Sequence, residues 1–131
     1  MENEKNQNRT FTPEELARMA VKILDDNKAH DIKLLSVRDK TVLTDYFVIC
    51  SGTSNTQIKA LSAELEYKLG EEGITPVGIE GYAEGTWIAM DYSHIIVHIF
   101  NRDLREFYKL EKLWNDAEEI PVASLGEGEN K

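Results

Sequence analysis

Apolar residues recur at spacings of three and four along three segments of the chain, which predicts three helices. The first helix begins with a capping box, in which Thr12 and Glu15 each bond the other's backbone, and it ends near residues 27–29. The second begins with a similar capping box at Ser54 and Gln57. Each helix has one apolar face, so each must pack against another element of the fold.

Runs of β-forming residues between these helices predict a sheet. Residues 45–50 form a nearly continuous apolar run, which is typical of a strand buried on both faces. The last two strands are joined by a hairpin turn near residues 91–94. The predicted strands are residues 32–37, 45–50, 76–81, 85–90 and 95–100. With a third helix at residues 102–114, this order predicts a single α/β domain with a mixed sheet of about five strands flanked by helices.

Composition narrows the class of protein. The chain has 131 residues, enough for one domain, and its 15 basic and 24 acidic residues give a net charge of -9. This balance disfavours unassisted binding to a nucleic-acid backbone and favours a basic protein surface as partner. No apolar run is long enough for a transmembrane helix, and the first residues lack the apolar region of a secretory signal, so we expect a cytoplasmic protein. We expect a domain at residues 12–120 between a disordered lead, residues 1–11, and a polar tail, residues 121–131.

The residues that most often carry chemistry are sparse. Cys50 is the single cysteine, which excludes an intramolecular disulfide and a cysteine metal cluster. His94 and His98 fall on or beside a strand, where their Cα atoms would be about 13 Å apart, too far to share a metal ion. The Ser-Gly turn at residues 51–54 lacks the ending of a phosphate-binding P-loop. We therefore expect no metal and no cofactor.

Trp87 is the most informative aromatic residue and leaves two interpretations open. On a regular strand Trp87 and Ala89 share one face, while Ile88 and Met90 share the other. Trp87 either closes the core or lies on a face that the helices leave uncovered, where it would anchor a partner.

Several segments together resemble the ribosomal silencing factor family, also called the Iojap-like family. The resemblance runs from about Leu16 to Ile120, in the right order and spacing. It departs from the family at Ser93-His94, where Gly-Asp is more frequent. The matching residues are Asp45-Tyr46-Phe47-Val48-Ile49, Ser51-Gly52, Ser54, Gln57, Glu80-Gly81, Gly85, Trp87, Asp91-Tyr92, Val97-His98, Phe100, Phe107-Tyr108, Leu110-Glu111, Leu113-Trp114 and Asp116-Ala117.

The resemblance implies a nucleotidyltransferase-like fold without catalysis. It implies that the protein binds the large ribosomal subunit through ribosomal protein fourteen on the intersubunit face. Such binding hinders joining of the small subunit and represses translation when nutrients are scarce. The resemblance also implies a homodimer, since several members of the family are homodimers. The net charge of -9 adds the expectation of little direct nucleic-acid binding.

The first choices for the partner surface lie along one strand and its turn: Trp87, Met90, Asp91 and Tyr92. Because Met90 alternates with Trp87, at most one of these two is exposed on a regular strand. Glu80 and Asp116 are further electrostatic candidates. Four residues near the end of the domain are assigned to the core or to a dimer interface: Phe107, Tyr108, Leu113 and Trp114.

Two alternative functions stay open. An assembly factor that leaves the mature large subunit would differ from a repressor only in timing. A nucleotide-dependent transferase would need carboxylates that bind Mg²⁺, and no strand carries an Asp-x-Asp or Asp-x-Glu pair. Such an enzyme would have to bring together distant residues, for example Asp45 and Asp91.

Overall fold

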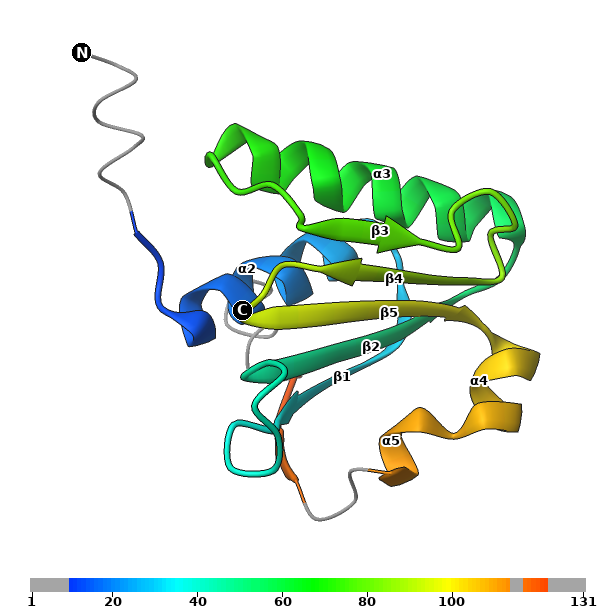
Figure 1. Cartoon of the computed structure of the whole chain (residues 1–131). Coiled ribbons are helices and arrows are strands. Elements are labelled where there is room, and N and C mark those ends of the chain that lie inside the picture. Colours follow the sequence, from blue (N-terminus) through cyan, green and yellow to red (C-terminus); the bar gives the residue numbers. More distant parts are fainter. Residues whose placement is uncertain (1–9, 114–116, 123–131) are drawn as a thin grey trace, which may run out of the picture.

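The computed structural model describes residues 10–113 and 117–122, except for the side chains of Phe107, Glu111 and Leu113. The helices are α2 (Pro13–Asp26), α3 (Asn55–Glu71), α4 (Arg102–Tyr108) and α5 (Leu110–Leu113) (Figure 1). The strands are β1 (His30–Ser36), β2 (Tyr46–Gly52), β3 (Gly78–Glu80), β4 (Trp87–Asp91), β5 (Ile95–Asn101) and β6 (Glu118–Ile120). The predicted α/β class is confirmed.

All the described strands belong to one mixed sheet in the order β3-β4-β5-β2-β1-β6. The central strands β2 and β5 run parallel, and the other neighbours are antiparallel. The prediction of about five strands missed β6. Two of its three residues are glutamates, which have low strand propensity, and pairing with β1 through Leu34 and Ile120 supplies the strand instead.

Helices α2 and α3 cover one face of the sheet and form the larger core with it. Leu24 of α2 and Leu65 of α3 are fully buried beside Val48 of β2 and Val97 of β5. A smaller cluster lies on the opposite face, below α4 and α5. Since β2 is covered on both sides, all seven of its residues are buried, as its continuous apolar run predicts.

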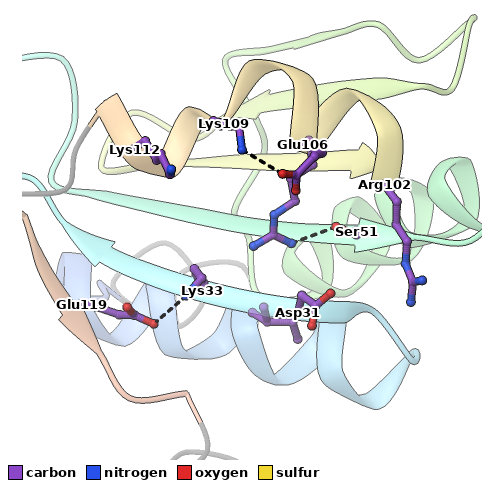
Figure 2. A pocket seen from close by; sticks show the side chains of 10 residues that line it. Asp31, Lys33, Ser51, Arg102, Glu106, Lys109, Lys112 and Glu119 are labelled. Atoms are coloured by element: carbon purple, nitrogen blue, oxygen red, sulfur yellow. Dashed lines mark hydrogen bonds and ion pairs between the residues drawn. The ribbon is translucent and has the colours of Figure 1, made fainter.

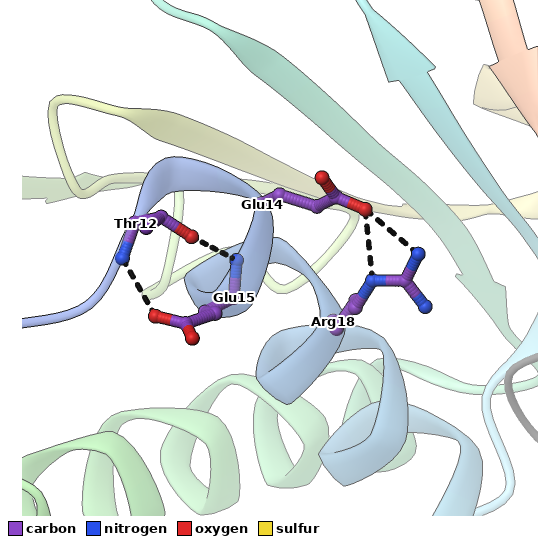
Figure 3. Close-up of polar contacts among 4 residues, drawn as sticks. All are labelled: Thr12, Glu14, Glu15 and Arg18. Atoms are coloured by element: carbon purple, nitrogen blue, oxygen red, sulfur yellow. Dashed lines mark hydrogen bonds and ion pairs between the residues drawn. The ribbon is translucent and has the colours of Figure 1, made fainter.

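The start of α2 confirms the predicted capping box (Figure 3). The backbone N–H of Glu15 donates to Thr12 Oγ1 at 3.0 Å, and the backbone N–H of Thr12 donates to Glu15 Oε1 at 2.9 Å. One turn later, the guanidinium of Arg18 pairs with Glu14 at 2.7 Å. The two capping-box bonds satisfy backbone N–H groups that have no partner within the helix.

The capping box predicted at the start of α3 forms only in part. The Ser54 hydroxyl accepts a hydrogen bond from the backbone N–H of Gln57 at 3.0 Å. The Gln57 side chain bonds Thr53 rather than the backbone of Ser54. The helix still begins where predicted, because one satisfied cap is enough to stop fraying at its first turn.

The third predicted helix is broken in two at Lys109. This residue has a φ of 49°, which ends α4 in the left-handed region before α5 begins. Leu104 and Leu110 both pack on the smaller cluster. On a continuous helix their side chains would point about 120° apart, so the break lets both reach the same apolar surface.

The predicted lead and tail, residues 1–11 and 121–131, lie largely outside the described residues and stay predictions. The same holds for Trp114 and Asp116, and for the side chains of Phe107 and Leu113. Within the described part of the chain, every helix is too short or too polar to cross a membrane.

A candidate partner-binding face on β4

Strand β4 lies between β3 and β5 and sends alternate side chains to opposite faces of the sheet. Ile88 and Met90 point into the larger core, and neither is exposed to solvent. Trp87, Ala89 and Asp91 point to the opposite face, and each is only partly buried. The predicted alternation along this strand is therefore confirmed.

Trp87 is held in an aromatic cluster. Its ring stacks on Phe100 of β5, with centroids 4.7 Å apart and planes inclined by 28°. Tyr108 at the end of α4 lies 5.1 Å from the Trp87 ring and is itself half-exposed. Below them, His98 packs edge-on against Phe47. We call these five residues, Phe47, Trp87, His98, Phe100 and Tyr108, the aromatic cluster.

His98 fixes the indole of Trp87 through a hydrogen bond. Trp87 Nε1 donates to His98 Nδ1 at 3.1 Å, so this imidazole nitrogen carries no proton. Burial lowers the pKa of His98 from 6.5 to about 4, because the charged imidazolium would lose its hydration. At neutral pH His98 is therefore a neutral acceptor, which is the state that the Trp87 bond requires.

Gly81 allows the chain to pass close to Trp87 in the turn between β3 and β4. It has a φ of 86°, in the left-handed region that favours glycine. A Cβ added here would overlap the backbone carbonyl oxygen of Trp87. The turn therefore positions the first residue of β4 as well as reversing the chain.

The exposed part of this surface continues from Trp87 toward the edge of the sheet. Glu80 of β3 pairs with Ala89, and Asp91 pairs with Ile96 of β5, so all four lie on one face. Glu80 is exposed and the other three are partly buried. We define the β4 face as Glu80, Trp87, Ala89, Asp91 and Ile96. It joins apolar side chains to two carboxylates.

Asp91 also has a structural role. Its Oδ1 accepts a hydrogen bond from the backbone N–H of Ser93 at 2.8 Å, in the predicted turn between β4 and β5. Ser93 has a φ of 73°, a conformation in which glycine costs less. The Asp91 bond helps to hold this turn and fixes the direction of its own carboxylate.

Two of the residues chosen from the sequence are not on the β4 face. Met90 is fully buried against α3, where Ser62 Oγ donates to its sulfur at 3.4 Å. Tyr92 follows it into the same core and is 5% exposed. The prediction that Met90 and Tyr92 contact a partner is corrected here, because strand alternation sends both side chains beneath α3. Asp116 lies outside the described residues, so the structure brings together Trp87, Asp91 and Glu80.

The residues considered for catalysis or metal binding have other roles in the structure. Asp45 Oδ2 lies 2.9 Å from His94 Nδ1, so the carboxylate proposed for a transferase already has a partner. Cys50 is buried, and burial raises the pKa of its thiol to about 12, far from the reactive range. Among the described residues, no group of three or more His, Cys, Asp and Glu side chains is placed to hold a metal ion.

Sequence reasoning missed three contributors to this site: Ala89, Ile96 and the bond from Trp87 to His98. A signal for the first two was present. A hairpin turn at residues 91–94 sets the register of the flanking strands, which places Ala89 opposite His98 and Ile96 opposite Asp91. The choice of His98 Nδ1 as acceptor depends on ring orientations that no sequence pattern fixes.

Comparison with known proteins relates the chain to one protein family. Residues 10–131 match the family model described as ribosomal silencing factor during starvation. The ribosomal silencing factor of Halalkalibacterium halodurans is 37% identical over 112 residues, which cover 86% of this chain and 96% of that protein.

More distant relatives include a protein of mouse mitochondria. The chain is 37% identical over 99 residues to the mouse protein named mitochondrial assembly of ribosomal large subunit protein 1, covering 73% of this chain and 43% of that longer protein. Among solved structures, a crystal structure of a Chromobacterium violaceum protein has a TM-score of 0.78 and 33% identity, covering 80% of this chain and 88% of that one.

Proposed function

Because the chain belongs to the ribosomal silencing factor family, we propose that it represses translation by binding the large ribosomal subunit. The proposed contact is ribosomal protein fourteen on the intersubunit face, where the bound protein hinders joining of the small subunit when nutrients are scarce. The proposed mechanism is obstruction by a docked domain, so it needs no catalytic group.

The observation that carries this proposal is the β4 face. A partly exposed Trp87, fixed by His98 and stacked on Phe100, is the kind of rigid aromatic anchor that dominates binding energy at many interfaces. Glu80 and Asp91 flank it and suit the basic side chains of a ribosomal protein. Aromatic, aliphatic and acidic groups thus lie together on one side of β4.

Co-sedimentation with purified large subunits tests the proposal. We expect Trp87→Ala to weaken binding by about 30-fold or more, because interface anchors contribute about 2 kcal/mol or more. Trp87→Phe should lose less, since it keeps the stacking on Phe100. Tyr67→Ala is the matched control, because Tyr67 is an exposed aromatic residue on α3.

Three results would contradict the proposal or the choice of Trp87 as its anchor. One is wild-type protein that stays unbound at micromolar concentration and low Mg²⁺. Another is a Trp87→Ala variant that loses its far-ultraviolet circular dichroism, because Trp87 would then be part of the core. The third, a variant that stays folded but binds normally, would reject Trp87 as the anchor.

An assembly role is the second candidate, and the mouse relative favours it. That protein is named for assembly of the mitochondrial large subunit. An assembly factor would bind precursor subunits and leave mature ones, whereas a repressor must bind mature subunits. Sedimentation with both kinds of particle separates the two roles. Homodimer formation and a cytoplasmic location stay predictions.

A further inference from the structure

A cavity of about 860 Å³ lies away from the β4 face, between β1 and β2 on one side and α4 and α5 on the other (Figure 2). Its size is that of a small-molecule site rather than of a single ion. Five cationic side chains are among the described residues that line it: Lys33, Arg102, Arg105, Lys109 and Lys112. They are a third of the 15 basic residues in a chain of net charge -9.

Among the described residues that line the cavity, three carboxylates lie with the five cations. Lys33 pairs with Glu119 at 3.3 Å, and Lys109 pairs with Glu106 at 2.8 Å, both near the rim (Figure 2). All four of these side chains are more than a third exposed, so solvent screens their attraction and a stronger partner can compete for the lysines. Asp31 is the remaining carboxylate among the described lining residues.

Arg105 forms the floor of the cavity. It is 9% exposed, and its Nη1 donates to Ser51 Oγ at 2.8 Å. A guanidinium withdrawn from water interacts strongly with an anion, because little solvent screens the attraction. Its planar fork of N–H donors also matches the oxygens of a phosphate group.

The approach to this floor is lined from two directions. Arg102 and Lys112 come from the α4–α5 segment, where the break at Lys109 redirects the chain. Asp31 and Lys33 come from β1, where Asp31 has a φ of 52° and the pairing with β2 shifts between His30 and Lys33. Such an irregularity re-aims side chains at the end of a strand.

We propose that this cavity binds a small anion that bears more than one phosphate group, such as a nucleoside polyphosphate. Several cations spread over one cavity suit a multiply charged ligand better than a single carboxylate. A concave site with its guanidinium at the floor suits a small molecule better than an RNA backbone. A long polyanion would also meet the net negative charge of the whole chain.

This site is separate from the proposed ribosome contact. The β4 face lies beside β3 at one side of the sheet, whereas the cavity involves β1 and β2, which follow β5 in the strand order. Binding in the cavity therefore needs neither Trp87 nor the subunit, and each proposal fails or stands by itself.

Titration calorimetry of the full-length chain at low salt tests the cavity with three probes: pyrophosphate, ATP and a short single-stranded RNA. The buffer contains EDTA, because a transferase site built on Asp45 would need Mg²⁺. We expect saturable binding of pyrophosphate and ATP. Arg102→Ala with Lys112→Ala should weaken it about tenfold or more, since the loss of even one hydrogen bond to a charged group costs about a factor of ten.

The matched control removes the same charge from the exposed surface of α2. Arg18→Ala with Lys22→Ala takes away one arginine and one lysine that pair with carboxylates outside the cavity. This variant should bind ATP within about twofold of wild type, because distant charges are screened. Arg105→Lys keeps the charge but loses the fork of donors, and should weaken binding while thermal melting confirms that it folds.

Three results would overturn the inference. The first is no saturable heat with pyrophosphate or ATP at millimolar concentration. The second is an equal loss of binding in the α2 control variant, which would mean a nonspecific charge effect. The third is RNA that binds more tightly than ATP and competes with it, which would assign the cavity to a nucleic-acid backbone. Loss of subunit binding in the Arg102 and Lys112 variant would overturn the separation from the β4 face.

Discussion

The side chain of Trp87 is held in place by three other aromatic residues. It stacks on Phe100, touches Tyr108 and donates to His98. Each contact removes rotamer freedom before a partner arrives, so less conformational entropy is lost on binding. A fixed indole therefore gives tighter association than the same exposed area on a mobile side chain.

His98 predicts how the stability of the protein depends on pH. Its pKa is about 4 in the fold and 6.5 without burial, so below pH 6.5 the unfolded chain binds the extra proton first. The free energy of unfolding should fall as the pH drops from 6.5 toward 4, by about 2 kcal/mol at pH 5. Urea denaturation at pH 7 and pH 5 measures this change.

The control for this prediction is His98→Gln. Glutamine keeps an acceptor for Trp87 Nε1 but does not titrate. The variant should therefore lose about 2 kcal/mol less than wild type between the two pH values. An equal pH dependence in both proteins would show that carboxylates, not His98, control stability over this range.

At the residue scale, the sequence predicts to which face of the sheet a side chain points better than it predicts whether that side chain is exposed. Alternation along β4 predicts that Trp87 and Met90 face opposite sides, and the structure confirms it. It does not predict which side the helices cover, because that depends on how α2 and α3 pack on the sheet. For this reason Met90 and Tyr92 appeared as contact candidates although α3 buries them.

At the scale of elements, the turn between β3 and β4 can be tested by substitution of Gly81. In Gly81→Ala, the new methyl group would meet the Trp87 carbonyl in a backbone conformation that already disfavours alanine. We expect a loss of stability of about 2 kcal/mol or more and weaker binding to the large subunit, because the turn positions Trp87. Chemical denaturation and co-sedimentation measure the two effects.

Gly78→Ala is the matched control for this turn. Gly78 lies on the neighbouring strand β3, has no atom within 4 Å of an added Cβ and does not have a positive φ. Its substitution should leave stability within about 0.5 kcal/mol of wild type. If the two variants have the same stability, the close approach of the turn to Trp87 does not contribute to the free energy of unfolding.

Elements with strong local signals were predictable, and those that depend on distant contacts were not. The helix at Pro13–Asp26 carries its own cap and apolar stripe, and the buried strand at Tyr46–Gly52 its own apolar run. By contrast, β6 exists through pairing with β1, and the break at Lys109 serves packing on the smaller cluster. The cations at positions 102, 105, 109 and 112 do have helical spacing, a signal of a basic surface that sequence reasoning overlooked.

Over the whole molecule, charge is unevenly distributed. The carboxylates of Glu80 and Asp91 lie on the β4 face, and a third of the basic residues line one cavity. Glu80→Gln with Asp91→Asn keeps each hydrogen-bond acceptor but removes the charge. If a basic protein is the partner, this variant should associate with the large subunit a few-fold more slowly at low salt, and the difference should shrink as KCl rises.

The control for charge is Glu66→Gln with Glu71→Gln on α3. It changes the net charge by the same amount at exposed positions away from the β4 face. Its association rate should stay near that of wild type at every salt concentration. Slower association in both variants would mean that total charge, rather than the β4 face, steers the encounter.

The parallel pairing of β2 with β5 has a consequence for synthesis of the chain. Strand β2 is the most apolar element, yet one of its two neighbours is made only after α3, β3 and β4. Until then its backbone groups on that side are open to any other strand, which is the condition for aggregation. A chain that stops before residue 95 should therefore form insoluble aggregates, whereas one that ends after β5 should have its central strand protected.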